Sequence, residues 1–321
     1  MKKLIILLIS IFFLTGCANY HELNELGIVS SILIDYKDSL FYTTIEVVDE
    51  EEFKTYAGVG SSLTNALDNA LSYSDKYLYY SHLNAIILTE NVPIDTTLNY
   101  FLRSPETNNT FYLCITENTD IYNQEKNIGE TLKNILKRVY KDNFFDTIKK
   151  LKDKNTDFVL PVLDKYMKIS TLNVYKDNTL VDTLNNNELN TLKLLYGYNE
   201  VYIKNGKDKY IELSINKIDK KINIKDKIEI KLDLEATVKQ ITTNEEANNI
   251  NDVKKIQERY NLEIKNNIKS LINKLKNNKS DILSLNNMIL NKYHNLDKHF
   301  YDYDFYIEVN THINKKGLLI K

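Results

Sequence analysis

Tryptophan is absent from this 321-residue chain, and proline, cysteine and arginine are rare. With 3 prolines, 8 glycines and 2 cysteines, the composition excludes collagen-like, proline-rich and disulfide-stapled proteins. The only arginines are Arg103, Arg138 and Arg259, so few side chains are suited to bidentate recognition of phosphate or carboxylate. The formal net charge is -2, and without an excess of basic residues nothing indicates a nucleic-acid partner.

Long hydrophobic runs are also missing, apart from one at the N-terminus. Lys2 and Lys3 precede an apolar run from Leu4 to Phe13, and the tetrad Leu14-Thr15-Gly16-Cys17 follows it. The run is too short to span a bilayer, and its flanks are those of an export signal. The pattern predicts a lipoprotein signal peptide over 1–16, cleaved to leave Cys17 with a diacylglycerol on its thiol. The alternative is an uncleaved N-terminal anchor with a chance cysteine.

Acylation of Cys17 has two consequences. Each buried CH₂ of a fatty chain such as palmitate contributes about 0.8 kcal/mol, so two chains give stable anchoring, and we expect a body on the outer face of a membrane. The second cysteine, Cys114, then has no disulfide partner within the chain. It lies in the strand-like run Phe111-Tyr112-Leu113-Cys114-Ile115, where a buried, unreactive thiol is favoured over a nucleophile.

The first half of the chain alternates β-rich runs with helical patterns. Leu26 to Tyr36 and Phe41 to Val48 flank a turn at residues 37–39 and predict a hairpin. A helix capped by Ser61 or Ser62 follows, with Leu63, Ala66, Leu67, Ala70 and Leu71 on one face. We further predict a strand over 82–89, a helix over 95–102 and a strand over 110–116. A helix over 128–139 and a charged helix or linker over 142–154 follow.

The second half is richer in strands. We expect strands over 169–175 and 179–184, a short helix over 188–195, and strands over 201–203, 210–218 and 228–241. Asp252 to Asn277 is the longest predicted helix, with an apolar stripe that would pack against a C-terminal antiparallel sheet. Asp281 is predicted to cap a helix ending near Tyr293, before a closing strand around Phe305 to Ile313. The fold class is multi-domain α+β, with domains over 17–160, 161–218 and 219–321.

A search for catalytic, metal and cofactor motifs gives no positive result. Gly58-Val59-Gly60-Ser61-Ser62 precedes a helix but lacks the ending of a P-loop, so an ordinary helix start is favoured over an anion site. The five histidines are His21, His82, His294, His299 and His312. Their spacing is not that of zinc ligands, so solvated or locally hydrogen-bonded side chains are favoured over a metal site. We therefore expect no catalytic residue, cofactor or metal. The lysines over 265–279 favour a solvated helix face over a lipid-binding one.

Short motifs along nearly the whole mature chain resemble, in the same order and spacing, the Ger(x)C family of spore germination lipoproteins, the C subunits of nutrient germinant receptors. These motifs are Cys17-x-x-Tyr20-x-Glu22-x-x-x-Leu26-x-Ile28-Val29 with Ile34-Asp35, Leu78-Tyr79-Tyr80-Ser81-His82-Leu83, Phe101-Leu102-Arg103-Ser104-Pro105-Glu106, Val174-Tyr175-Lys176-Asp177-Asn178-Thr179-Leu180-Val181 before Leu184 to Glu188, Ser280-Asp281-Ile282, and Asn314-Lys315-Lys316-Gly317-Leu318. The chain departs from the family in having Ala18-Asn19 where a tryptophan usually follows the cysteine, and in lacking the C-terminal tryptophans.

The resemblance implies a three-domain, non-catalytic lipoprotein that assembles with two multi-pass receptor subunits at the outer face of the spore inner membrane or the cell membrane. Its one assigned site is Cys17, for lipid attachment. Arg103 and Glu106 are the best polar candidates elsewhere, as a pair that stabilises a turn or, less favoured, as a contact with a partner. Two alternatives remain: a solute-binding lipoprotein of a transporter, with a cleft between two α/β lobes, and a lipid-anchored hydrolase.

Overall fold

The computed structural model describes residues 22, 25–49, 52–123, 126–198, 201–205, 210–242 and 250–314. They fall into two compact units. The first contains β1 (Leu26–Lys37), β2 (Leu40–Asp49), β3 (Glu52–Gly60), α2 (Leu63–Leu71), β4 (Tyr77–Tyr79), β5 (Ala85–Leu88), α3 (Ile94–Arg103), η2 (Ile121–Asn123) and the start of α4 (Ile128–Val139).

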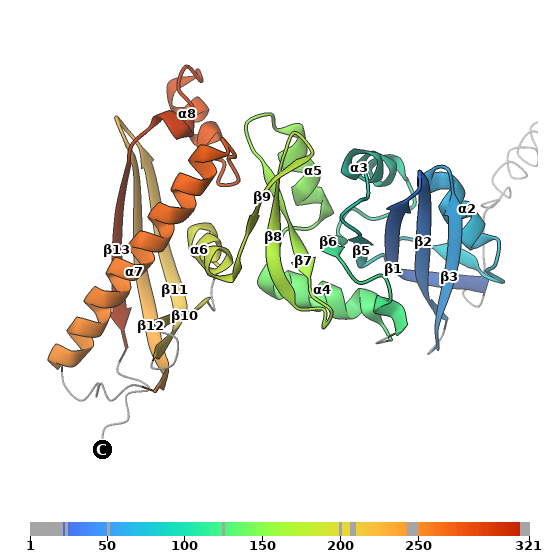
Figure 1. Cartoon of the computed structure of the whole chain (residues 1–321), viewed down its shortest axis with the longest axis horizontal. Coiled ribbons are helices and arrows are strands. Elements are labelled where there is room, and N and C mark those ends of the chain that lie inside the picture. The colour runs from blue at the N-terminus through green and yellow to red at the C-terminus, as the bar shows by residue number, and fades with distance from the viewer. Residues whose placement is uncertain are drawn as a thin grey trace, which may run out of the picture. The chain divides into compact units, whose positions relative to one another are not determined.

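The second unit contains the rest of α4, two groups of strands and four further α-helices (Figure 1). Its elements are β6 (Tyr112–Thr116), α5 (Phe144–Lys152), β7 (Phe158–Leu163), β8 (Ile169–Lys176), β9 (Thr179–Leu184), α6 (Asn186–Tyr196), β10 (Val201–Asn205), β11 (Ile211–Ile224), β12 (Ile228–Ile241), α7 (Ile250–Asn277), α8 (Leu285–Tyr293), η3 (Phe300–Asp302) and β13 (Phe305–Ile313). The α+β class predicted from the sequence is confirmed.

The sheet of the first unit is built on the predicted hairpin. β1, β2 and β3 pair antiparallel, and β4 and β5 pair parallel to β1. The turn residues Asp38 and Ser39 both have positive φ, 50° and 63°, as in the two-residue turns whose twist matches that of the strands they join. β3 and β4 were not predicted from the sequence, and β5 is shorter than the strand predicted over 82–89.

Helix α2 packs closely on β2 and β3 because the third strand has glycine at two points of approach. A Cβ on Gly58 would lie 2.1 Å from the Ala66 carbonyl oxygen, and one on Gly60 would lie 2.5 Å from the Ala66 nitrogen. Ser62 accepts a 3.2 Å hydrogen bond from the Asn65 N–H and caps the helix. The glycine-rich segment therefore allows α2 to pack closely on β3 and contains an ordinary helix start.

The strands of the second unit form two groups. β6 and β7 are parallel, and β7, β8 and β9 are antiparallel, with a tight turn at Asp177 and Asn178. The C-terminal group has the order β10-β11-β12-β13. Its first three strands are antiparallel, as predicted, but β13 pairs parallel to β12. The expectation of a wholly antiparallel sheet is wrong because α7 acts as a crossover that returns the chain to the same end of the sheet.

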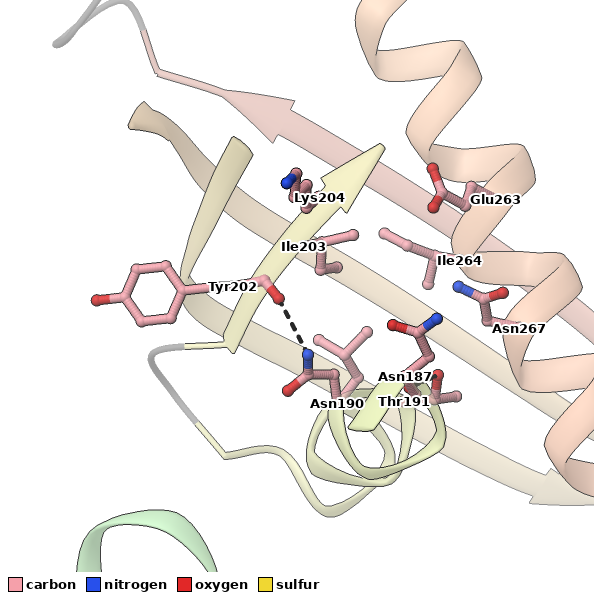
Figure 2. Close-up of a pocket in the computed structure, with 10 residues that line it drawn as sticks. Asn187, Asn190, Thr191, Tyr202, Ile203, Lys204, Glu263, Ile264 and Asn267 are labelled. Carbon is pink, nitrogen blue, oxygen red and sulfur yellow. Dashed lines mark hydrogen bonds between the residues drawn. The ribbon is translucent and has the colours of Figure 1, made fainter. Parts of the chain in front are cut away.

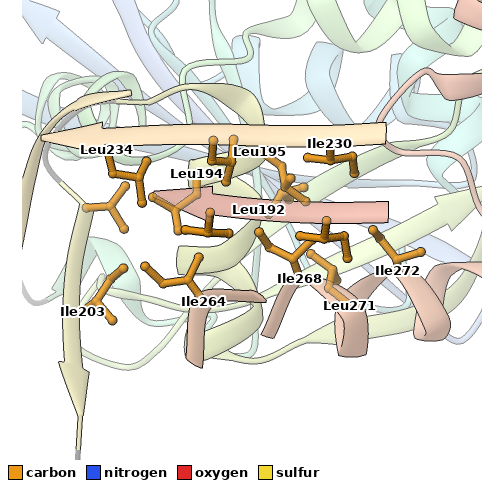
Figure 3. Packing of buried hydrophobic residues seen from close by; sticks show 14 of the residues in the cluster. Leu192, Leu194, Leu195, Ile203, Ile230, Leu234, Ile264, Ile268, Leu271 and Ile272 are labelled. Atoms are coloured by element: carbon orange, nitrogen blue, oxygen red, sulfur yellow. The ribbon is translucent and has the colours of Figure 1, made fainter. Parts of the chain in front are cut away.

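Helix α7 lies across the C-terminal sheet, as the apolar stripe predicts (Figure 1). Tyr260 and Ile268 are fully buried, and Ile264, Leu271 and Leu275 retain 2% exposure or less. Figure 3 shows Ile264, Ile268 and Leu271 of α7 facing leucines of α6 and the apolar side of β12. This cluster holds α6, α7 and the sheet together, and burial of its apolar side chains stabilises the unit.

Candidate functional site

The lipid-attachment residue predicted from the sequence, Cys17, lies outside the described residues. The same is true of the signal peptide over 1–16 and of the closing Gly317. Within the described ranges, no helix is both long enough and apolar enough to cross a membrane. Lipid attachment at Cys17 therefore stays a prediction.

The loop after α3 brings two of the motifs together. Ser81 Oγ donates a 3.2 Å hydrogen bond to the Glu106 carbonyl oxygen, and Asn108 Nδ2 donates to the Ser81 carbonyl. Thr107 Oγ1 closes the turn on the carbonyls of Phe101 and Ser104, at 3.4 and 3.2 Å. The segment around Ser81 and the loop over 104–108 thus form one hydrogen-bonded surface of the first unit.

Arg103 and Glu106 lie on this surface, with both side chains exposed. No ion pair joins them, so the prediction of a turn-stabilising pair is wrong: backbone groups and hydroxyls hold the turn. Both residues line a shallow depression of about 480 Å³ with Tyr100. Burial, reinforced by the charges of Asp68 and Glu106, raises the pKa of the Tyr100 phenol. The phenol is therefore a neutral hydrogen-bonding group at physiological pH.

A polar cavity of about 150 Å³ lies in the second unit between α6, β10 and α7 (Figure 2). Its apolar lining comes from Leu194, Ile203 and Ile264, and its polar lining from Asn187, Asn190, Thr191, Tyr202, Lys204, Glu263 and Asn267. Figure 2 shows Lys204 on the strand and Glu263 on the long helix, on opposite sides of the cavity. The Lys204 ammonium is also 3.6 Å from the centre of the Tyr210 ring.

The chemistry available to this cavity is limited. Asn190 Nδ2 donates a 3.3 Å hydrogen bond to the Tyr202 carbonyl, and Thr191 Oγ1 donates to the Asn187 carbonyl at 2.9 Å. Both polar groups are thus already engaged with the backbone. The volume is below the range of about 300–1,000 Å³ typical of ligand pockets, so the cavity suits a few waters or one small polar group.

Reactive side chains are not grouped in the part of the chain that the structure describes. No group of three or more His, Cys, Asp or Glu there is placed to hold a metal ion. Cys114 is fully buried, and burial raises the pKa of its thiol. Because the thiolate is the reactive form, this confirms the prediction of a buried, unreactive cysteine.

Two buried carboxylates organise helix starts. Glu46, 1% exposed on β2, accepts hydrogen bonds from the N–H groups of Ile128 and Gly129 at 2.7 and 2.9 Å, and from the Ser31 hydroxyl at 2.9 Å. These N–H groups begin α4, where a negative charge is favourable. Glu46 was not predicted from the sequence. Its only sequence signal is that it is the one acidic residue between Leu40 and Val48, among apolar and hydroxyl side chains.

Asp281 does the same for α8. It is 2% exposed, and its carboxylate accepts from the N–H groups of Leu285 and Asn286 at 2.9 and 2.6 Å. The predicted capping role is confirmed. Burial raises the pKa of Asp281 to about 7, against the opposing effect of these hydrogen bonds. The Asp281 N–H donates in turn to the Asp157 carboxylate at 2.7 Å, and the pKa of Asp157 is also raised by burial.

Comparison with known proteins gives consistent matches. The family profile described as "Spore germination protein N-terminal domain" matches residues 19–165, and the profile described as "Spore germination B3/GerAC like, C-terminal" matches residues 170–317. The spore germination protein GerQC of Bacillus cereus is 28% identical over 222 residues, 61% of each chain. The spore germination protein KC of Bacillus subtilis (strain 168) is 25% identical over 114 residues.

These alignments span 61% and 28% of the lengths of the two curated relatives. A crystal structure of the GerBC protein superposes with a TM-score of 0.60, covering 88% of this chain and 96% of that one at 16% identity. The structural likeness therefore establishes the fold, and the paired profiles identify the family.

Proposed function

Since this chain belongs to the Ger(x)C family of spore germination proteins, we propose that it is the lipid-anchored C subunit of a nutrient germinant receptor. In this proposal Cys17 holds the protein at the outer face of the membrane, and the body assembles with membrane-embedded receptor subunits. The observation that supports it most is the tandem match of both family domains over 19–165 and 170–317.

The proposed role is one of assembly and not of catalysis. Arg103, Pro105 and Glu106 are exposed on a surface tied to Ser81 by backbone and side-chain hydrogen bonds. Such an exposed polar surface suits the rim of a contact with another protein. The alternatives of a solute-binding protein and a hydrolase gain no specific observation, because the polar cavity of about 150 Å³ is small and two of its polar side chains, Asn190 and Thr191, bond the backbone.

The test is nutrient-triggered release of dipicolinate from spores that lack this gene, complemented with the wild type, Cys17→Ala or Cys114→Ala. We expect the deletion to abolish release, the wild type and Cys114→Ala to restore it, and Cys17→Ala to restore it poorly. Cys114→Ala is the matched control because its thiol is buried in the body. Normal release in the deletion strain, in a background without related receptors, would overturn the proposal.

The anchor is tested separately by fractionation. Wild type and Cys114→Ala should sediment with membranes, and Cys17→Ala should remain in the soluble fraction or keep an uncleaved signal. Equal membrane association of Cys17→Ala in its cleaved form would show that lipid on Cys17 is not the anchor.

A further inference from the structure

The free edge of β13 is a sheet edge with backbone groups left available for pairing. Strands alternate the direction of their backbone groups, so every second residue of an edge strand points its N–H and C=O away from the sheet. The Asn314 N–H donates to Ala236 of β12, and the Asp304 carbonyl accepts from Ile228 of β12. Even-numbered residues therefore face the neighbouring strand, and odd-numbered residues face the free edge.

Side chains of α7 form hydrogen bonds with backbone groups at the two ends of this edge. Asn261 Oδ1 accepts a 2.8 Å hydrogen bond from the Thr311 N–H. Thr311 is odd-numbered, so its N–H faces the free edge. At the other end Lys276 Nζ donates to the Tyr303 carbonyl at 2.8 Å. Between these contacts, no hydrogen bond to the edge-facing groups of Ile307 and Val309 is found within the described residues. Unpaired groups of this kind are a template for another strand.

A groove of about 390 Å³ runs beside this edge. The long helix provides Lys265, Lys269, Ile272, Asn273 and Lys276, and the strand side provides Asp304, Phe305, Tyr306 and Ile307. Three of its charged side chains are thus cationic and one is anionic. Lys265 and Lys269 are exposed and form no ion pair with another described residue. The groove is therefore a positively charged channel beside the edge of β13, where Ile307 and Val309 retain 5% and 7% exposure.

We propose that this groove, defined by the lining residues above and the edge of β13, binds an extended acidic segment of a partner polypeptide by strand addition. Backbone hydrogen bonds to Ile307 and Val309 would give affinity, and carboxylates beside Lys265 and Lys269 would give selectivity. From Asn261 to Lys276 the helix rises about 22 Å, which leaves room for about six residues of added strand.

Charge argues against a second copy of this chain as the occupant. Pairing two β13 edges would bring the Lys265 and Lys269 side chains of both copies to one interface, and like charges there are unfavourable. The inference deepens the proposed assembly role and rests on it only for the existence of a protein partner. It is tested with purified protein and a synthetic peptide, so its result and that of the germination assay are independent.

The probe is a fluorescein-labelled eight-residue peptide that alternates glutamate with valine, and the readout is fluorescence anisotropy with the full mature chain in detergent. We expect saturable binding that weakens at least tenfold in Lys265→Glu/Lys269→Glu. The charge-matched control Lys254→Glu/Lys255→Glu, on exposed positions of the same helix outside the groove, should change binding less than twofold. A peptide that alternates lysine with valine should not bind.

Two further measurements separate strand addition from simple charge attraction. The acidic peptide with N-methyl groups on its four central residues should lose binding, and the normal peptide should slow hydrogen exchange at the Ile307 and Val309 amides. Absence of saturable binding, or binding indifferent to N-methylation, would overturn the proposal and leave the lysines as edge protection only. So would lysine-dependent binding to vesicles of phosphatidylcholine and phosphatidylglycerol that the peptide does not compete away.

Discussion

At the scale of single residues, Glu46 and Asp281 are the two positions where the body depends most on one charged group. Each is almost completely buried, and each accepts two N–H groups at a helix start. A buried donor that loses its acceptor costs about 1–3 kcal/mol. The two carboxylates should therefore respond to substitution much more strongly than surface acids do.

Replacement of Glu46 by alanine should lower the free energy of unfolding by about 3 kcal/mol or more, because two buried donors of α4 lose their acceptor. Glu46→Gln should cost less, since the amide oxygen can still accept. Urea unfolding followed by circular dichroism measures this, because the chain has no tryptophan. A Glu46→Ala protein as stable as the wild type would show that water or another group satisfies the helix.

Asp281 should make stability depend on pH. Its folded pKa of about 7 lies above the ordinary value of 3.8, so the folded state binds the proton more tightly than the unfolded state. The protonated group therefore adds to the free energy of unfolding, fully below about pH 4. This added stability is lost as the pH rises toward 7, and the free energy of unfolding falls by up to about 1.4 kcal/mol per pH unit. Urea midpoints between pH 4.5 and 7.5 should fall less steeply in Asp281→Asn. Parallel profiles for the two proteins would contradict this.

At the scale of elements, the glycines separate two kinds of constraint. Gly58 is required by space, because a Cβ there would lie 2.1 Å from the Ala66 carbonyl oxygen of α2. Gly197 is required by conformation: it ends α6 with φ of 74° and has open space around it. Replacing glycine by alanine should thus destabilise the fold at both positions, by steric overlap at Gly58 and by backbone strain at Gly197.

We expect Gly58→Ala to destabilise by about 2 kcal/mol, through overpacking of α2 on β3, and Gly197→Ala by about 1 kcal/mol, through backbone strain. Asparagine tolerates positive φ, so Gly197→Asn should recover most of the loss, whereas Gly58→Asn should be worse than Gly58→Ala. Thermal melts of the four variants give the comparison. Equal recovery by asparagine at both positions would refute the distinction.

Most elements were predictable because their apolar residues repeat with the period of a helix or strand. β3 was not, because it is largely exposed and glycine-containing. It forms because β2 offers it a hydrogen-bonding edge. The charged end of β11, from Asp219 to Lys221, was missed for the same reason: β12 pairs with it throughout. Glu46 and the parallel placement of β13 depend on contacts between distant segments, which periodicity does not report.

At the scale of the whole molecule, its two cysteines report whether the N-terminus is processed as proposed. Cys114 is fully buried with a raised thiol pKa, and Cys17 would hold its lipid through the thiol. Protein extracted from membranes should therefore react with no maleimide when native and with one equivalent, at Cys114, in denaturant. Labelling of Cys17 in the native protein, located by mass spectrometry, would identify an unacylated anchor instead.

The parallel pairing of β13 with β12 also bears on how the protein folds. Ile228 meets Phe305 in register, although α7 and α8 lie between them in the chain. Contacts between residues so far apart in the sequence slow folding. The entropy of closing the long intervening loop is lost before the strand pairing can stabilise the fold. The C-terminal sheet can be completed only after the chain has been synthesised through Ile313. A nonsense mutation just before Phe305 would therefore leave the edge of β12 and the part of α7 that packs on β13 uncovered, and its product should aggregate rather than persist as a shortened protein.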